Sequence, residues 1–416
     1  MKVTSDLLRQ IAAEQGPSFY LLDSARFRQN FTDLTQAFRA HYERTVIAYS
    51  YKTNYVPRFV QLVAELGGYA EVVSSMEMAL AQKIGVPASK IFFNGPYKEI
   101  DATAALLGAG GTVNVDHPLE LDRIVALADS HEGAPLRLGL RCNFDVQDGV
   151  VSRFGFDVDQ PGFRDAIARI DAHPGLELTG LHCHFATRSL DSWRNRTLGM
   201  LDVIDRHFRD RLDALRQVSL GGGLYGRMPD ALKAQFPVAI PSFAEYANVA
   251  SKPFRDYFST RPENERPELL IEPGTALVAD ALKYACTVNG LKCVRGQDVV
   301  SLTGSSYNMN PNPNRKNVPI EVFPADGATG GAELTDALLG GYTCIESDYL
   351  YKGYTGHLSP GDMLVFDDIG SYSVVMKPPF ILPNVAIVEP DADGADYSIV
   401  KRKETFEDIF RTYSFI

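Results

Sequence analysis

Two patterns of hydrophobic and polar positions alternate over roughly the first 270 residues of the chain. Short apolar runs, typical of buried strands, are separated by amphipathic stretches such as 58–66, 75–84 and 118–128, typical of helices. The predicted strands lie at 45–51, 69–73, 91–94, 112–115, 136–142, 178–184, 217–220 and 269–272. Eight alternations of strand and helix predict an α/β fold, a parallel (β/α)8 TIM barrel.

The pattern changes after about residue 277, where Val and Tyr alternate with turn residues and helical spacing becomes scarce. This texture predicts strands at 282–287, 298–303, 362–366 and 371–376. An apolar run at 18–23 precedes the barrel pattern and has no helical partner, so we expect it to join these strands. The predicted domains are a barrel at 28–275 and a β-rich domain formed by 1–27 and 276–416.

Composition limits the classes of function. The 416 residues are 45% hydrophobic and 22% charged, as in an ordinary globular protein. A formal net charge of -11 argues against nucleic-acid or anionic-membrane partners. The start of the chain has no signal-peptide core, and the five scattered cysteines lack paired zinc-type spacing. We therefore expect a cytoplasmic protein without a metal site.

Polar residues follow most of the barrel strands, at the end where such barrels place their chemistry. Lys52 ends the first strand, and a partly desolvated amine there is a nucleophile, although a solvent-exposed lysine fits the same pattern. Glu272 ends the last strand, where a buried carboxylate needs a donor such as a pyridinium N–H. The glycines at 221–223 form either a phosphate-binding loop or a plain turn.

His182 and His184 occupy alternate positions of a predicted strand, so we expect them to face the same side. A metal pair would need a further ligand, and none is spaced with them. A ring-stacking histidine is therefore favoured, with an ordinary core histidine as the alternative. Cys344 lies in a polar turn rather than an apolar run.

In this order, the motifs resemble the fold-type III pyridoxal-phosphate (PLP) decarboxylases, which include ornithine, arginine and diaminopimelate decarboxylases and have an alanine-racemase-like barrel. The resemblance implies PLP as cofactor and the catalytic residues Lys52, Glu272, His184 and Cys344. The cofactor-binding residues that it implies are Lys52, Glu71, His184, Thr187, Gly221, Gly222, Gly223, Glu272, Gly274 and Tyr372. The substrate-binding residues that it implies are Arg315, Cys344, Ile345, Glu346 and Asp348.

The resemblance also implies a mechanism. Lys52 holds the cofactor as an imine, and Glu272 keeps the pyridine nitrogen protonated so that the ring stabilises the carbanion left by CO2. Cys344 then reprotonates that carbanion. In the family this cysteine comes from the partner subunit, so we expect a homodimer with active sites shared at the interface.

Two departures from the family pattern bear on the substrate. Thr275 replaces the arginine of Glu-Pro-Gly-Arg, and Arg188 or Arg227 could supply the missing charge. Ile345 replaces the acid that meets a distal amine, and Glu346 is shifted by one residue. These changes favour a substrate with an anionic or neutral-polar far end, as in siderophore or secondary-metabolite biosynthesis. The alternative is a diaminopimelate or basic amino acid (ornithine, lysine or arginine) decarboxylase.

Other readings fit less well. A PLP-dependent racemase would carry an arginine in place of Glu272 and a catalytic tyrosine in place of Cys344. A non-catalytic relative of the antizyme-inhibitor type would have lost Lys52 or the cysteine. A metal hydrolase built on His182 and His184 lacks further ligands.

Overall fold

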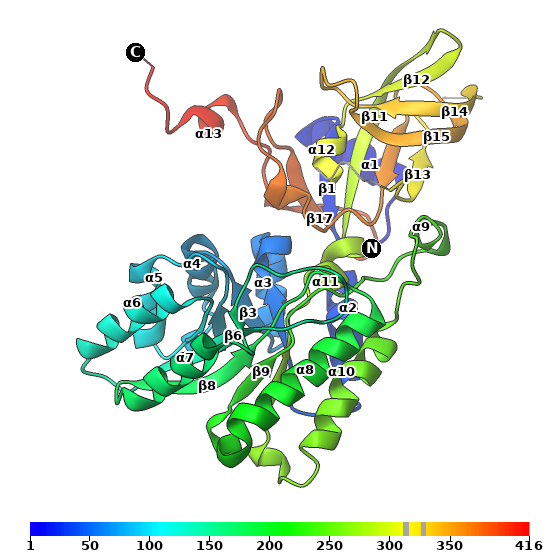
Figure 1. Cartoon of the computed structure of the whole chain (residues 1–416). Coiled ribbons are helices and arrows are strands. Elements are labelled where there is room, and N and C mark those ends of the chain that lie inside the picture. The colour runs from blue at the N-terminus through cyan, green and yellow to red at the C-terminus, as the bar shows by residue number, and fades with distance from the viewer. Residues whose placement is uncertain (311–315, 326–329, 416) are drawn as a thin grey trace. The chain divides into compact units, whose positions relative to one another are not determined.

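The structure is a computed structural model that describes residues 1–310, 316–325 and 330–415 (Figure 1). The chain forms two compact units, and each is described by itself. One unit consists of residues 28–225 and 240–276, and the other of 1–27, 226–239 and 277–416.

The first unit is a closed barrel of eight parallel strands, as the alternating pattern predicts. In spatial order the strands are β2, β3, β4, β5, β6, β8, β9 and β10, with β10 pairing back to β2. Their bounds are β2 (Thr45–Ser50), β3 (Tyr69–Val72), β4 (Ile91–Phe93), β5 (Thr112–Val115), β6 (Leu136–Asn143), β8 (Leu176–His182), β9 (Gln217–Ser219) and β10 (Glu268–Ile271). The short β7 (Phe156–Asp157) extends β6.

Helices follow the strands, and several begin with a local signal in the sequence. The α4 helix is capped by Ser74, whose hydroxyl accepts from the Glu77 amide, and α10 begins with a capping box between Ser242 and Glu245. The larger helices are α2 (Ser24–Arg39), α3 (Pro57–Glu65), α4 (Ser75–Ile84), α5 (Ile100–Gly108), α6 (Pro118–Asp129), α7 (Pro161–Ala172), α8 (Leu190–Phe208) and α10 (Phe243–Tyr257).

The barrel interior is apolar at mid-height and polar at the carboxyl ends of the strands. Ala48, Phe92 and Leu270, from β2, β4 and β10, form a buried cluster. Side chains alternate along a strand, so the inward-facing Leu270 is followed two residues later by Glu272. The same alternation brings Glu71 to the carboxyl end of β3. The register of the barrel thus gathers buried acids at one end.

The second unit is a mixed sheet that runs β15-β14-β12-β11-β1-β17-β18, with β16 pairing β11 and β13. As expected, the early strand β1 (Ser18–Leu22) belongs here, between antiparallel β11 (Leu282–Val294) and parallel β17 (Ala386–Pro390). The other strands are β12 (Gln297–Leu302), β13 (Ile320–Phe323), β14 (Ala332–Gly340), β15 (Tyr349–Leu358), β16 (Met363–Phe366) and β18 (Tyr397–Lys401). Helix α1 (Ser5–Gln15) buries Leu7, Leu8 and Ile11 against the sheet.

Three expectations differ from the structure. The predicted strand at 371–376 is a turn followed by the 3-10 helix η6 (Val374–Met376), because Tyr372 adopts a left-handed φ of 59° that ends any extended run. His184 lies beyond the end of β8, so it does not share a strand with His182. Residues 226–239 group with the second unit, where Gln235 exchanges hydrogen bonds with Asn317.

No helix in the described part of the chain combines the length and the hydropathy that crossing a membrane requires.

Candidate active site

Lys52 ends the first barrel strand in a short 3-10 turn, η1 (Tyr51–Thr53), and its amine points at a buried acid. The Nζ atom donates to Glu71 in a close ion pair and to the Ser50 hydroxyl at 2.7 Å. The side chain of Lys52 is 35% exposed and that of Glu71 only 1%. Lys52 is therefore a reachable amine with an immediate proton acceptor.

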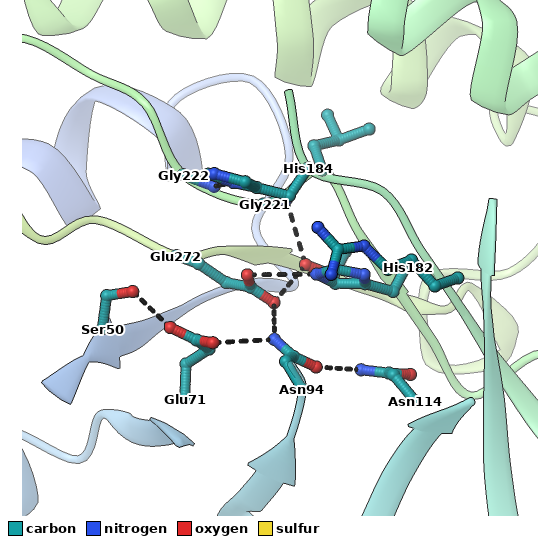
Figure 2. A network of polar contacts seen from close by, with 12 residues as sticks. Ser50, Glu71, Asn94, Asn114, His182, His184, Gly221, Gly222 and Glu272 are labelled. Carbon is teal, nitrogen blue, oxygen red and sulfur yellow. Dashed lines mark hydrogen bonds and ion pairs between the residues drawn. The ribbon is translucent and has the colours of Figure 1, made fainter. Parts of the chain in front are cut away.

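Glu272 is the second buried carboxylate of the site (Figure 2). Its Oε1 accepts from Ser219 Oγ at 2.7 Å and from Asn94 Nδ2 at 3.2 Å, and its Oε2 lies 3.2 Å from His182 Nε2. Burial alone would raise the pKa of Glu272, but the charge and hydrogen bond of His182 and the hydrogen bond from Ser219 outweigh it and hold that pKa below its usual range. Glu272 is thus kept as an anion.

Asn94, at the end of β4, joins the two acids (Figure 2). Its amide nitrogen donates to Glu71 at 3.1 Å as well as to Glu272, and its oxygen accepts from Asn114 at 2.6 Å. Because an amide presents two donors and one acceptor, this orientation fixes both carboxylates relative to one another.

Arg141 and Asp116 form a buried ion pair at the ends of neighbouring strands. The Nη1 atom of Arg141 lies 3.3 Å from Asp116 Oδ1, and its guanidinium lies over the ring of Phe154, which Arg153 covers at 4.1 Å. Burial lowers the pKa of Arg141, although Asp116, Glu272 and Glu71 favour its charged form. A buried cation therefore offsets the two acids of the site.

The glycine run follows β9 and packs tightly between two strand ends. A side chain at Gly222 would come within 2.2 Å of the Glu272 carbonyl oxygen, and Gly221 has a left-handed φ of 71°. The Gly222 amide donates to His184 Nδ1 at 2.9 Å (Figure 2). Nδ1 must then be unprotonated, which agrees with the lowering of the His184 pKa by burial and by the charge of Lys52.

Arg196, on α8, is completely buried and forms hydrogen bonds with this loop. It donates to four backbone carbonyls, those of Phe185, Thr187, Leu220 and Gly222, at 2.7–3.1 Å. Trp193, one turn earlier, donates its indole N–H to the Gly223 carbonyl at 2.9 Å. Arg196 therefore links the segment after β8 to the glycine loop through hydrogen bonds, and its positive charge lies next to the backbone of both segments.

Arg188 lies beside Thr275, the residue that stands where the resemblance leads us to expect an arginine. Its Nη2 is 3.4 Å from the Thr275 hydroxyl, and its guanidinium is 5.2 Å from the centre of the Tyr225 ring. Of the two cations considered from the sequence, Arg188 belongs to the barrel unit, whereas Arg227 belongs to the other unit.

The remaining predicted residues lie in the second unit or outside the described residues. Cys344 and Glu346 are exposed, and Ile345 and Tyr372 are half-buried. Asp348 is buried and accepts hydrogen bonds from Ser305, Ser306 and Thr343 at 2.6–3.3 Å, so it anchors the Cys344 turn. Arg315 lies outside the described residues.

Within the barrel, Thr187 contributes its carbonyl oxygen to Arg196, and Gly274 packs against Thr53, where a side chain would come within 1.9 Å. In residues 1–310, 316–325 and 330–415, no three His, Cys, Asp or Glu side chains gather closely enough to hold a metal ion.

A family model described as the pyridoxal binding domain of pyridoxal-dependent decarboxylases matches residues 26–279. The chain belongs to this decarboxylase family. It is an amino-acid carboxy-lyase that uses PLP. The donor set of the site fits that cofactor: a reachable amine at Lys52, an anionic carboxylate at Glu272 for the ring nitrogen and a neutral imidazole at His184.

Relatives along nearly the whole chain agree with this assignment. A diaminopimelate decarboxylase of Synechocystis sp. is 27% identical over 95% of this chain and 86% of its own length. An L-glutamyl-(BtrI acyl-carrier protein) decarboxylase of Niallia circulans is 25% identical over 95% of this chain and 93% of its own. The crystal structure of the M. jannaschii diaminopimelate decarboxylase has the same fold, with a TM-score of 0.84 at 22% identity, over 98% and 94% of the two chains.

Proposed function

We propose that this PLP-dependent decarboxylase acts on an amino acid whose distal end carries a carboxylate or an acyl group, with diaminopimelate as the leading candidate. The observation that carries the proposal is the agreement of relatives over nearly the full chain, most of which are diaminopimelate decarboxylases. They favour diaminopimelate over the secondary-metabolite substrate expected from the sequence, and they give no support to siderophore assembly.

The residues of the barrel would divide the chemistry between them. When bound, PLP supplies an electron-withdrawing ring that accepts the electron pair released as CO2 leaves. Lys52 would hold the cofactor, and Glu71 Oε2 is placed to take and return the proton of the lysine amine. Glu272, held as an anion by His182 and Ser219, would keep the ring nitrogen protonated. The neutral imidazole of His184 would help to hold the cofactor ring.

The glycine loop and two arginines would bind the cofactor phosphate. Backbone amides at 221–223 can approach an anion closely because no side chain intervenes. Arg196 adds positive charge next to the loop, and no acidic side chain in the described part of the chain forms an ion pair with it. Arg188, bonded to a neutral hydroxyl rather than a carboxylate, keeps its charge available for the same anion. Together they compensate for the arginine that Thr275 replaces.

Cys344 would act as the proton donor at the end of the reaction, supplied by the partner subunit of a homodimer. Its exposed position in a turn anchored by Asp348 supports this role, because a donor that reaches another subunit must lie at the surface of its own. Ile345 and Glu346 follow it and would meet the far end of the substrate. Ile345 offers no charge to a distal amine, so it disfavours the distal ammonium group of diaminopimelate and agrees better with the second candidate below.

A second candidate substrate is an amino acid acylated through its far carboxyl group. The Niallia circulans relative, whose name gives an L-glutamyl group on a carrier protein as its substrate, supports this candidate. A half-buried Ile345 would suit a neutral acyl linkage better than an ammonium group.

Steady-state CO2 release by the holoenzyme tests the proposal. We expect the highest kcat/KM with meso-diaminopimelate, or with an L-glutamyl thioester if the second candidate holds, and weak activity with ornithine, lysine and arginine. The variant Ile345→Glu should move the preference toward the basic amino acids. CO2 release from the basic amino acids alone would contradict the proposal. So would the absence of CO2 release from every substrate tested when the absorbance of the enzyme shows that PLP is bound to the lysine.

A further inference from the structure

The barrel has a second opening, a pocket of about 580 Å³ at the end opposite Lys52 and Glu272. Its inner wall includes Tyr69, Thr112 and Gln217, each the first residue of its strand, whereas the catalytic side chains follow the strands' carboxyl ends. The volume is within the range of small-molecule sites. The pocket is therefore separate from the site described above.

Two arginines face this pocket without a hydrogen-bond or ion-pair partner for their guanidinium groups among the described residues. Arg44 precedes β2 and Arg137 is the second residue of β6, so they line it from well-separated strands. Neither guanidinium forms a hydrogen bond or ion pair with the described residues, and the Nε atom of Arg44 is buried and unsatisfied. A buried donor without a partner destabilises the protein, and a bound acceptor would remove that cost.

No acid of the pocket forms an ion pair with either of these two cations among the described residues. Asp213 and Glu265 are both paired with Arg261, which does not line the pocket. Glu268 accepts from the Tyr69 hydroxyl at 3.3 Å, and burial raises its pKa although the charge of Arg44 acts against that rise.

Further cations surround the same opening. Arg266 lines the pocket and donates to the backbone carbonyls of Arg261 and Ser259, and it forms no ion pair with a carboxylate of the described residues. Arg216 also lines it and is paired with Glu177. Lys90 lies over the Tyr69 ring at 5.6 Å. The opening thus carries an excess of positive charge.

We propose that the amino-terminal mouth of the barrel is a binding site for a small polyanion, a metabolite with two or more carboxylate or phosphate groups. Arg44 and Arg137 bind its charged groups from opposite sides, since a guanidinium offers paired donors to either type of oxyanion. The hydroxyl of Thr112 and the amide of Gln217 contact its uncharged part. The site is independent of the substrate chosen above.

Isothermal titration of the PLP-loaded enzyme with citrate and with pyrophosphate, at fixed ionic strength, tests this proposal. We expect saturable binding of at least one probe with the cofactor absorbance unchanged, which separates this site from the phosphate loop. Arg44→Gln and Arg137→Gln should each weaken binding at least about tenfold, since each removes a charge-assisted contact. Arg137→Lys should restore part of it. Preference for one probe identifies the carboxylate or the phosphate class.

The matched control is Arg169→Gln, which removes an arginine paired with Asp122 on the outer helices. It should leave probe binding unchanged. Each variant is first checked for an unchanged melting temperature and unchanged CO2 release, so that a folding defect is not read as lost binding. No binding of either probe by the wild-type enzyme would overturn the proposal, and so would equal binding by the wild type and both glutamine variants.

Discussion

Arg188 donates a hydrogen bond across 3.4 Å to the hydroxyl of Thr275, 87 residues further along the chain. The family sequence has an arginine where Thr275 stands. Arg188 therefore places a guanidinium beside the residue that stands where the family has an arginine.

Arg188→Ala should weaken PLP binding by about 10- to 100-fold, because a charge-assisted hydrogen bond contributes about 1.5–3 kcal/mol. Titration of the apoenzyme with PLP, followed by absorbance, measures this. The matched control is Arg194→Ala on the nearby surface of α8, where the arginine pairs with exposed Asp191. A loss of PLP affinity in Arg227→Ala but not in Arg188→Ala would show that Arg227, and not Arg188, supplies the charge.

His182→Gln should make the apoprotein less stable in acid. The pKa of Glu272 lies below its ordinary value in the folded state, so its contribution to stability is present above about pH 4.5 and is lost as the pH falls further. Without His182, burial is less opposed and raises the pKa of Glu272, so the contribution shrinks. The midpoint of acid unfolding should move to higher pH, whereas His173→Gln, which changes a histidine bonded to Asp129, should not move it.

The same variant should also shift the acid limb of the kcat/KM profile to higher pH, because Glu272 would become protonated earlier. An unchanged limb together with an unchanged unfolding midpoint would remove His182 from the control of Glu272.

Glu77→Gln should stabilise the protein above pH 7. Burial and the charge of Glu71 raise the pKa of Glu77 to about 7, against the lowering effect of a hydrogen bond from the Val73 amide. The folded state therefore holds a proton that the unfolded chain has lost between about pH 4.5 and 7, and stability falls as the pH rises through that range. Melting temperatures across this range should decline for the wild type and stay flatter for the variant.

The comparison variant Glu245→Gln should have the opposite effect, since hydrogen bonds from Ser242 lower the pKa of this exposed carboxylate. Parallel pH profiles for the wild type and Glu77→Gln would show that Glu77 does not titrate in this range.

Lys52→Ala and Cys344→Ala should each abolish most CO2 release, yet a mixture of the two should recover activity. In a homodimer with shared sites, random exchange leaves one intact site in half of the dimers, which gives about a quarter of wild-type activity. Activity is measured before and after incubation under conditions that allow exchange. A mixture that stays at the level of its two parents would rule out a site made from both subunits.

The barrel was predictable because each strand carries its own signal. A short apolar run followed by a polar residue occurs at Lys52, Asn94 and Glu272, and parallel pairing brings those residues to one end. The prediction failed at 371–376, where an alternating pattern of side chains conceals the left-handed backbone of Tyr372. Periodicity reports which face a residue occupies and carries no information about the sign of φ.

The buried arginines of the site could not be predicted in the same way. Arg196 occupies an ordinary position in a long amphipathic helix, and its four acceptors are backbone oxygens from two distant loops. Backbone acceptors leave no trace in the sequence. Arg141 likewise needs Asp116 from a neighbouring strand to explain its burial. Arg188 was recognised as one of two candidates, but only the fold brings it to Thr275.

Trp193 is the only tryptophan in the sequence, and its indole N–H is bonded to the carbonyl of Gly223. Indole emission depends on hydrogen bonding and on nearby absorbing groups, so the chain carries its own optical reporter at the loop proposed to bind phosphate. Loading of the cofactor, and any movement of that loop during turnover, should be visible in stopped-flow fluorescence without attaching a dye.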